Sequence, residues 1–99
     1  MAYILEMDAE WDERKRLANL AKHRIDFVDA RRIFEGRVLV KDELRRDYGE
    51  DRFSAVGEFE KRIFYVIYTR RGDSIRIISA RRAGRYEREK YYASLNARS

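Results

Sequence analysis

The fold is decided by residues 62–80, whose sequence is RIFYVIYTRRGDSIRIISA. Residues 62–69 are apolar on both faces of an extended chain, which is typical of a strand in the middle of a sheet. Residues 71–74, RGDS, have the composition of a turn, and the largely apolar residues 74–80 follow as the returning strand. This stretch therefore predicts a β-hairpin at the centre of a sheet.

The residues before the hairpin predict one strand and two short helices. Residues 3–7 form a short run that contains strand formers. Asp12 stands where the N-cap of a helix over residues 13–22 belongs, and Asp26 caps a second helix that Gly36 ends. Because the two helices are short and closely connected, we expect them to form a hairpin that packs on the sheet.

The remaining elements complete an α+β fold. They are, in order, a strand over residues 37–41, a charged loop over 42–51, a strand over 52–59 and, after the hairpin, a helix that opens at Gly84 or Arg85. Gly57 is expected to mark a β-bulge, and residues 96–99 are expected to fray. The sequence thus predicts one domain over residues 1–99 in the order β-α-α-β-β-β-(β)-α, with a small, mostly antiparallel sheet.

The composition excludes several classes of protein. The 99 residues contain no cysteine and a single histidine, which excludes disulfide scaffolds, thiol catalysis and metal sites built from cysteine or several histidines. No phosphate-binding or dinucleotide-binding motif is present, so no cofactor is expected. The N-terminus does not resemble a signal peptide and no apolar stretch approaches the roughly 18 residues of a membrane span, so we expect a soluble, cytoplasmic protein.

Basic charge is concentrated in residues 70–90, which hold eight basic and three acidic side chains in a chain of net charge +5. Seven of the eight are arginines, whose forked guanidinium pairs well with phosphate. Aromatic side chains are interleaved with them, which favours nucleic acid as the partner. The residues predicted to contact it are Trp11, Tyr65, Arg70, Arg76, Arg82, Arg85, Arg88 and Tyr91. Trp11 has an alternative role, since it also suits packing at the start of the first helix.

Simple alternation divides the returning strand into two faces. It puts Arg76, Ile78, Ala80 and Arg82 on one face and Ile75, Ile77, Ser79 and Arg81 on the other. Arginines at the ends of the strand can then frame a phosphate site lined by Tyr65 or Tyr68. The alternative is that these arginines are solvated and pair with Glu87, Glu89 or the loop over 42–51.

The candidate catalytic side chains are Arg81, His23, Lys22, Glu58 and Tyr68. Arg81 closes a strand beside the central one, where a framework can hold it rigidly. His23 is the only side chain that titrates near neutral pH without perturbation, although it also suits a helix cap after Lys22. Glu58 is a candidate general base, and the spacing does not separate it from Glu60. The acidic residues of the loop over 42–51 alternate with basic ones, which favours salt bridges over magnesium binding.

Short motifs recur along the chain in a specific order. They are EWDE at residues 10–13 with Lys15 and Asn19, KHRI at 22–25 followed by Phe27, Ala30 and FEG at 34–36, VIYT at 66–69, RIISAR at 76–81, and Ala83, Glu87, Arg88 and Tyr91. Together they resemble the BrnT-type toxins of bacterial type II toxin–antitoxin modules over most of the chain. Arg24 stands where such sequences often have glycine, so we expect the end of the first helix to differ slightly.

This resemblance implies a RelE-like fold and a ribonuclease that arrests growth by cutting RNA. It also implies an antitoxin with a ribbon-helix-helix portion, which binds operator DNA and represses the operon in a complex with two toxin and two antitoxin chains. A metal-free nuclease of this kind uses the RNA 2′-hydroxyl as its nucleophile, which spares DNA. We expect the antitoxin to be attracted by residues 70–90 and anchored on exposed helix faces or on Tyr86, Tyr91, Tyr92 and Leu95.

The residues themselves leave two other classes of function open. One is a nucleic-acid-binding module without catalysis, which would use the same basic surface. The other is a protein whose arginines bind an acidic protein partner.

Overall fold

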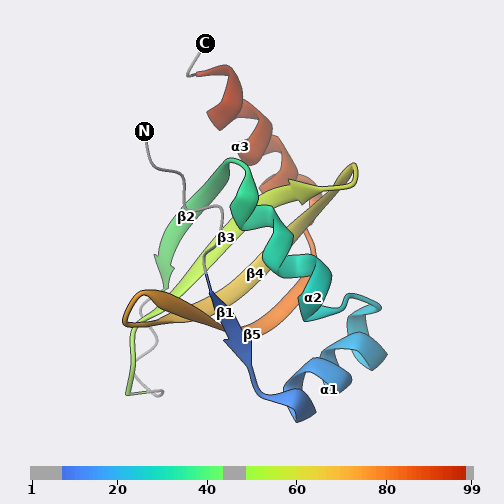
Figure 1. The fold of residues 1–99 in the computed structure, drawn as a ribbon. Coiled ribbons are helices and arrows are strands. Elements are labelled where there is room, and N and C mark those ends of the chain that lie inside the picture. The colour runs from blue at the N-terminus through green and yellow to red at the C-terminus, as the bar shows by residue number, and fades with distance from the viewer. Residues whose placement is uncertain (1–7, 44–48, 98–99) are drawn as a thin grey trace.

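Five strands form one sheet within residues 8–43 and 49–97, the part of the chain that this computed structural model describes (Figure 1). The strands are β1 (Ala9–Trp11), β2 (Val38–Glu43), β3 (Arg52–Phe59), β4 (Arg62–Arg71) and β5 (Ser74–Arg82). Their order across the sheet is β1-β5-β4-β3-β2, with β1 parallel to β5 and the other neighbours antiparallel. The α+β class and the central position of β4 are thereby confirmed.

The helices begin at the predicted caps. They are α1 (Glu13–His23), α2 (Phe27–Ala30) with its 3₁₀ continuation η1 (Arg31–Glu35), and α3 (Arg85–Asn96) after β5. The carboxylate of Asp12 accepts a hydrogen bond from the backbone N–H of Arg14, at 2.8 Å. Asp26 accepts one from the N–H of Val28, at 3.0 Å, and Gly36 ends the second helix, which tightens to 3₁₀ halfway along.

The end of α1 carries local backbone strain. Arg24 closes the helix in the left-handed conformation, with φ at 61°, and its N–H donates to the carbonyl of Leu20. Glycine adopts this conformation without steric cost, whereas other residues do so rarely. Arg24 therefore ends α1 in a backbone conformation that favours glycine.

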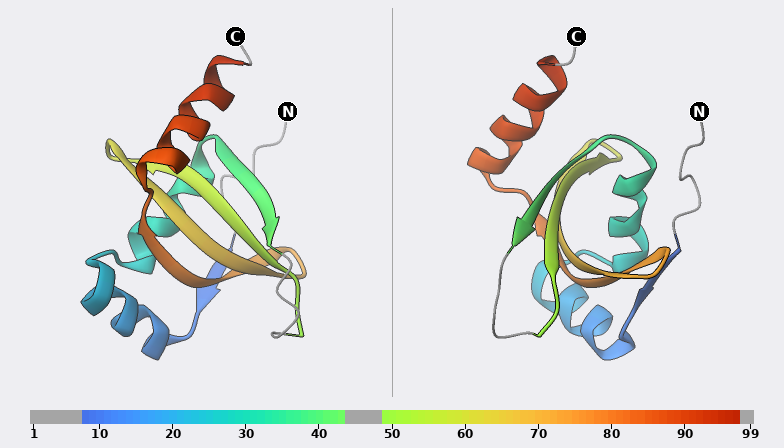
Figure 2. Two further views of the ribbon diagram at one scale, coloured as in Figure 1. Left: turned by 180° about the vertical axis from the view of Figure 1, so that it is seen from behind. Right: turned by 90° about the vertical axis from the view of Figure 1, so that its left-hand side faces the viewer.

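Helices pack on both faces of the curved sheet (Figure 2). α2 and η1 lie on the face that forms the main core, whose largest fully buried side chains are Phe27, Ile33, Phe64, Val66 and Ile77. α3 lies on the other face, over a smaller buried cluster made of Val56, Ile63, Ala83 and Tyr91. α3 is thus held to the sheet by a small apolar contact.

A buried asparagine joins α1 to β5. The side-chain amide of Asn19 donates to the carbonyl oxygens of Ile25 and Ala80, at 3.0 and 2.8 Å, and its oxygen accepts a hydrogen bond from the N–H of Ala80 at 3.0 Å. The pairing of β1 with β5 extends only to Ile77, so Asn19 satisfies backbone groups beyond it. The strand is thereby fixed one residue before Arg81.

The predicted bulge at Gly57 is wrong. Gly57 pairs with Val38 and Phe64 in an unbroken register. Glycine is required there for a different reason, because a Cβ atom would lie 2.9 Å from the Cβ of Ile33 and 3.0 Å from a methyl group of Val38. η1 therefore packs closely on β3 at this position.

The irregularity in the sheet lies between β4 and β5 instead. Ile67 pairs with Ser79 and Tyr68 pairs with Ile77, so Ile78 is an extra residue in β5. The predicted strand over residues 3–7 lies outside the described residues, as do 44–48 of the predicted loop and 98–99 of the predicted frayed tail.

Candidate active site

The extra residue in β5 decides which arginine faces α3. Ile75, Ile77 and Ala80 all lie in the main core, although simple alternation puts Ala80 on the face opposite the two isoleucines. The predicted division of the strand into faces is therefore wrong beyond Ile78. As a result Arg81 lies across from Tyr65, on the face that carries α3.

Three neighbours hold the side chain of Arg81. Its guanidinium stacks on the ring of Tyr65, with 4.0 Å between the guanidinium carbon and the ring centroid. Its two terminal nitrogens donate to the two carboxylate oxygens of Glu87, at 2.8 and 2.7 Å, and one of them also donates to the carbonyl of Arg82 at 3.1 Å. The side chain nevertheless remains 41% exposed, so a ligand can reach it.

Glu87 belongs to the first turn of α3. Its carboxylate also accepts a hydrogen bond from the N–H of Gly84, the N-cap, at 2.7 Å. Hydrogen bonds from Arg81 lower the pKa of Glu87, and the opposing effect of its partial burial is smaller. Because a carboxyl group with a lowered pKa is a weak proton acceptor, Glu87 suits the role of holding Arg81 better than that of a general base.

Further arginines gather where β5 leads into α3. Arg82, Arg85 and Arg88 are exposed, and Arg88 donates back to a carbonyl oxygen between the two elements at 2.9 Å. Arg85 pairs with Glu89 at 3.1 Å, with both side chains more than half exposed, so solvent screens this pair strongly. We call Arg81, Arg82, Arg85 and Arg88 the junction arginines; they place positive charge around the N-terminus of α3.

A groove of about 720 Å³ runs between α3 and the strands β2, β3 and β4. Its lining includes Tyr65 and Glu87, the two side chains that hold Arg81. Lys41 from β2 and Lys90 from α3 also line it. The groove therefore leads directly to the surroundings of Arg81.

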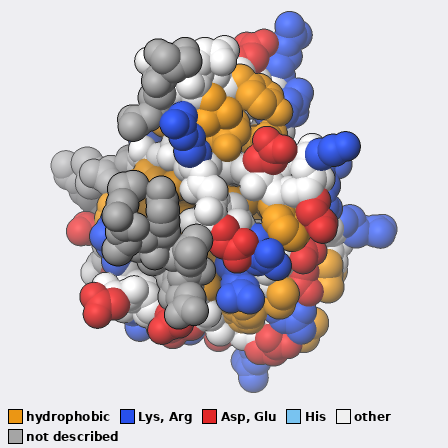
Figure 3. Space-filling view, turned by 45° about the horizontal axis from the view of Figure 1, so that its top comes forward, with side chains coloured by type: hydrophobic (Ala, Val, Ile, Leu, Met, Phe, Trp, Pro, Cys, Tyr) orange, Lys and Arg blue, Asp and Glu red, His pale blue; other side chains and the backbone are white. Residues whose placement is uncertain are grey.

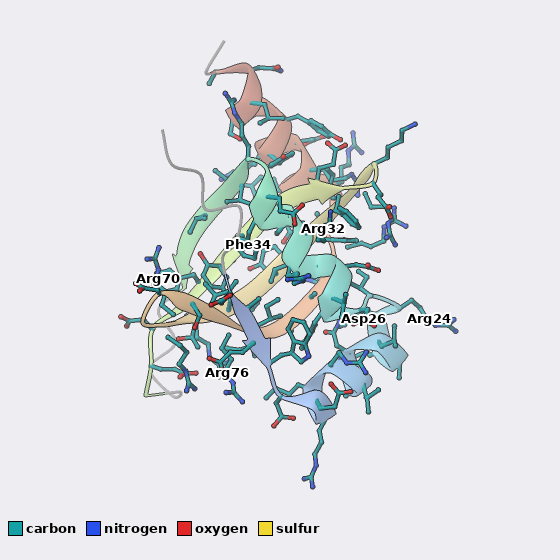
Figure 4. The ribbon with its side chains drawn as sticks, in the orientation of Figure 1. Arg24, Asp26, Arg32, Phe34, Arg70 and Arg76 are labelled. Carbon is teal, nitrogen blue, oxygen red and sulfur yellow. The ribbon has the colours of Figure 1, made fainter. Side chains whose placement is uncertain are left out.

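Two of the predicted arginines lie far from this junction, near the β4–β5 turn (Figure 4). The guanidinium of Arg70 lies 5.5 Å from the ring centroid of Phe53. Arg76 pairs with Glu10 of β1, with 3.1 Å between nitrogen and oxygen. The predicted basic region is therefore divided between the two ends of β5, and only one end meets α3.

Three predicted aromatic residues pack into the protein. Tyr68 is 3% exposed and meets Phe34 edge to face, with ring centroids 5.3 Å apart. Tyr91 is 4% exposed and donates its hydroxyl to a backbone carbonyl at 3.1 Å. Trp11 is half-buried and meets Phe27 edge to face. These positions favour structural roles for all three, including the packing role that the sequence leaves open for Trp11.

The predicted proton carriers lie in different places. Lys22 and His23 form the end of α1, the helix that packs on β5 through Asn19. Glu58 is exposed and lies on the sheet face that carries α3, because side chains of β3 alternate and its neighbour two residues earlier is buried under α3. Burial raises the pKa of Tyr91, and the charge of Glu58 adds to this effect. Of these candidates, Glu58 shares a face of the sheet with Arg81.

The sequence does not predict the residues that β2 contributes to the groove, which are Leu39, Val40 and Lys41. No motif marks them, and the pairing of β2 with β3 brings them opposite α3. Glu87 does carry a local signal, since it follows Gly84 at the spacing of a capping box.

Within residues 8–43 and 49–97, no three Asp, Glu or His side chains gather in a group that could hold a metal ion. The helices of the same ranges lack the length and hydrophobicity needed to cross a membrane.

The match to a known family covers three of the four junction arginines. No curated protein matches the chain significantly. The family model of the BrnT ribonuclease toxins of type II toxin–antitoxin systems matches residues 11–87, which include Tyr65, Arg81 and Glu87. The chain therefore belongs to the BrnT family of type II ribonuclease toxins.

Proposed function

We propose that this chain is a RelE-like endoribonuclease that cuts RNA without a metal ion and uses Arg81 to bind the scissile phosphate. The observation that carries the proposal is the fixed position of Arg81 between Tyr65 and Glu87, at the end of a groove. A donor that is positioned before the substrate arrives stabilises a transition state without reorganisation. Arg82, Arg85 and Arg88 surround it and supply charge for the flanking phosphates.

The reaction follows from the chemistry of RNA. A base removes the proton of the 2′-hydroxyl, and the oxygen attacks the adjacent phosphorus. The bond between phosphorus and the 5′-oxygen breaks, and an acid protonates the leaving oxygen. The products are a 2′,3′-cyclic phosphate and a 5′-hydroxyl, and Arg81 stabilises the charge that builds up on the phosphorane.

Glu58 is the proposed general base, because it is exposed on the sheet face that carries Arg81 and α3. His23, next to Lys22, is the alternative, because histidine is the commonest general base in enzymes. Tyr68 has no place in this proposal, since its ring is packed between neighbours in the main core.

The family match supports an antitoxin partner and an RNA substrate. We propose in addition that the antitoxin carries a ribbon-helix-helix portion, that the complex contains two chains of each kind, and that it represses its operon by contacting operator DNA through the antitoxin. The toxin acts in the cytoplasm in this proposal.

The proposal is tested by incubating the purified chain in EDTA with a single-stranded RNA and with the DNA strand of the same sequence. We expect the RNA to be cut to 2′,3′-cyclic phosphate and 5′-hydroxyl ends, and the DNA to stay intact. A preparation of Arg81→Ala, purified identically, controls for contaminating ribonuclease. Intact RNA that binds tightly and in a salt-sensitive manner would favour a nucleic-acid-binding module without catalysis instead.

A further inference from the structure

The groove beside α3 is lined by apolar side chains on both of its sides. The strands contribute Leu39 and Val56, and α3 contributes Tyr86 and Ala93. Tyr86 is 67% exposed, and Ala93 is exposed as well. Neighbouring exposed apolar side chains on a soluble protein mark an interaction surface. Figure 3 shows hydrophobic side chains grouped in the upper part of the view, with basic and acidic side chains around them.

The charge of the groove points to an acidic occupant. Lys41 stands on the β2 side and Lys90 on the α3 side, with the ammonium of Lys90 4.9 Å from the ring centroid of Tyr86. Glu87 is the acidic residue among the lining side chains, and Arg81 and Gly84 already engage its carboxylate. A segment that combines carboxylates with apolar side chains therefore complements the groove.

β2 offers a second means of holding a peptide here. It is the edge of the sheet among the described residues, and Leu39, Val40 and Lys41 of this strand line the groove. An edge strand presents backbone N–H and C=O groups that an extended peptide can pair with. These backbone groups, together with the apolar lining, favour a polypeptide over RNA as the occupant.

We propose that this groove is the docking site of the antitoxin and that an acidic, partly apolar segment of the antitoxin fills it. The family match supplies an antitoxin as partner, and the groove supplies the place where it binds. An occupant covers Tyr65 and Glu87, the side chains that hold Arg81, and so blocks access to that arginine. This blocking effect rests on the proposed function of Arg81, whereas the docking site itself does not.

Of the four α3 side chains expected to anchor a partner, two are available for this role. Tyr86 and Tyr92 are 67% and 47% exposed, and Tyr86 lines the groove. Tyr91 is buried and Leu95 packs against the cluster beneath α3. The structure therefore assigns the anchoring role to the exposed tyrosines.

The test compares matched surface variants in complex formation with the protein encoded next to the toxin gene. Ala93→Glu adds a negative charge to the groove, and Ala18→Glu is its control, because Ala18 is also an exposed alanine of a helix but lies on α1. Lys90→Glu reverses a charge in the groove, and Lys15→Glu is its control, because it reverses a charge on α1, outside the groove. Tyr86→Ala removes an exposed ring without adding charge.

We expect Ala93→Glu, Lys90→Glu and Tyr86→Ala to weaken antitoxin binding by about tenfold or more, chiefly through faster dissociation for Tyr86→Ala. The two controls should bind as the unchanged chain does. All five variants should keep its melting temperature within a few degrees and its rate of RNA cleavage, because none alters a proposed catalytic residue.

Unchanged antitoxin affinity in all three groove variants would overturn the proposal. Reduced RNA cleavage with unchanged antitoxin affinity would also overturn it, by assigning the groove to RNA. If the unchanged chain failed to cut RNA, the proposed function would fail, and the binding measurements would still decide the docking site.

Discussion

Arg81 and Glu87 join the last strand to the last helix through two parallel hydrogen bonds, of 2.8 and 2.7 Å. The pair is only six residues apart in sequence, and the turn at Gly84 lets the carboxylate reach back over β5. The same carboxylate thus starts α3 and orients the arginine. Formation of α3 and placement of Arg81 are therefore coupled.

Replacing Arg81 should reduce RNA cleavage strongly. Arg81→Ala is expected to lower the cleavage rate by about 10²–10³, the typical effect of removing one positioned transition-state donor. Arg81→Lys should also be impaired, because an ammonium group cannot reproduce the two parallel hydrogen bonds of a guanidinium. Single-turnover cleavage of a labelled RNA measures both effects.

Arg32→Ala is the matched control for this experiment. Arg32 is 43% exposed, pairs with Glu35 at 2.8 Å and stacks over Phe59, but it lies on η1 at the other face of the sheet. Equal loss of cleavage in Arg32→Ala and Arg81→Ala would show that general loss of basic charge, and not the junction, is responsible.

Glu87→Gln should destabilise the protein in a pH-dependent manner. Hydrogen bonds from Arg81 lower the pKa of Glu87 below its ordinary value of 4.5. A group whose pKa is lower in the folded state stabilises the fold above its unfolded pKa, and this contribution is lost as the pH falls through the folded pKa. The difference in melting temperature between Glu87→Gln and the unchanged chain should be largest near neutral pH and shrink below about pH 4. A difference that stays constant from neutral to acidic pH would contradict this.

Glu58→Gln should lower the cleavage rate by about 10²–10⁴ while RNA affinity is retained, as expected for loss of a general base. Glu60→Gln is the control, because Glu60 is exposed in the turn after the same strand. His23→Gln should keep both the rate and the pH–rate profile, which would assign His23 to the end of α1. If His23→Gln instead lowered the cleavage rate strongly and changed the pH–rate profile, His23 would be the base and Glu58 would not.

Gly57→Ala should destabilise the fold by about 1–3 kcal/mol, the usual effect of overpacking a well-filled site. The added methyl group would lie within 3.0 Å of both Ile33 and Val38. Gly36→Ala is the control, because no atom lies within 4 Å of a Cβ at that position. Urea unfolding measures the free energy of unfolding of both variants. Equal stability would mean that Ile33 and Val38 shift easily to make room for a methyl group at position 57.

The sequence predicts the structure correctly where the signal is local. Asp12 and Asp26 are identified as caps because a short acidic side chain directly before a helical segment can accept hydrogen bonds from the free N–H groups of the first turn. The strand over residues 52–59 is predicted with the observed bounds, and the central hairpin follows from its continuous apolar run. The resemblance to BrnT-type toxins supplies the family, which composition alone does not.

The site depends on contacts that no local pattern encodes. Ile78 is apolar like Ile75 and Ile77, so nothing in the sequence distinguishes the extra residue from its neighbours. Simple alternation therefore puts Arg81 on the same face as Ile75 and Ile77, whereas the structure puts it on the opposite face. The stacking of Arg81 on Tyr65 and the position of β2 opposite α3 both depend on strand register. Register is fixed by packing over the entire sheet.

Asn19 also protects the protein from association with itself. Beyond Ile77, the outer side of β5 has no strand beside it among the described residues, and the side chain of Asn19 occupies the backbone donor and acceptor of Ala80. A strand edge with unoccupied backbone groups is a template on which a second chain can add a strand. Loss of this side chain therefore does more than weaken the contact between α1 and β5: it frees backbone groups at a strand edge beside Arg81, where intermolecular strand pairing would compete with the native state.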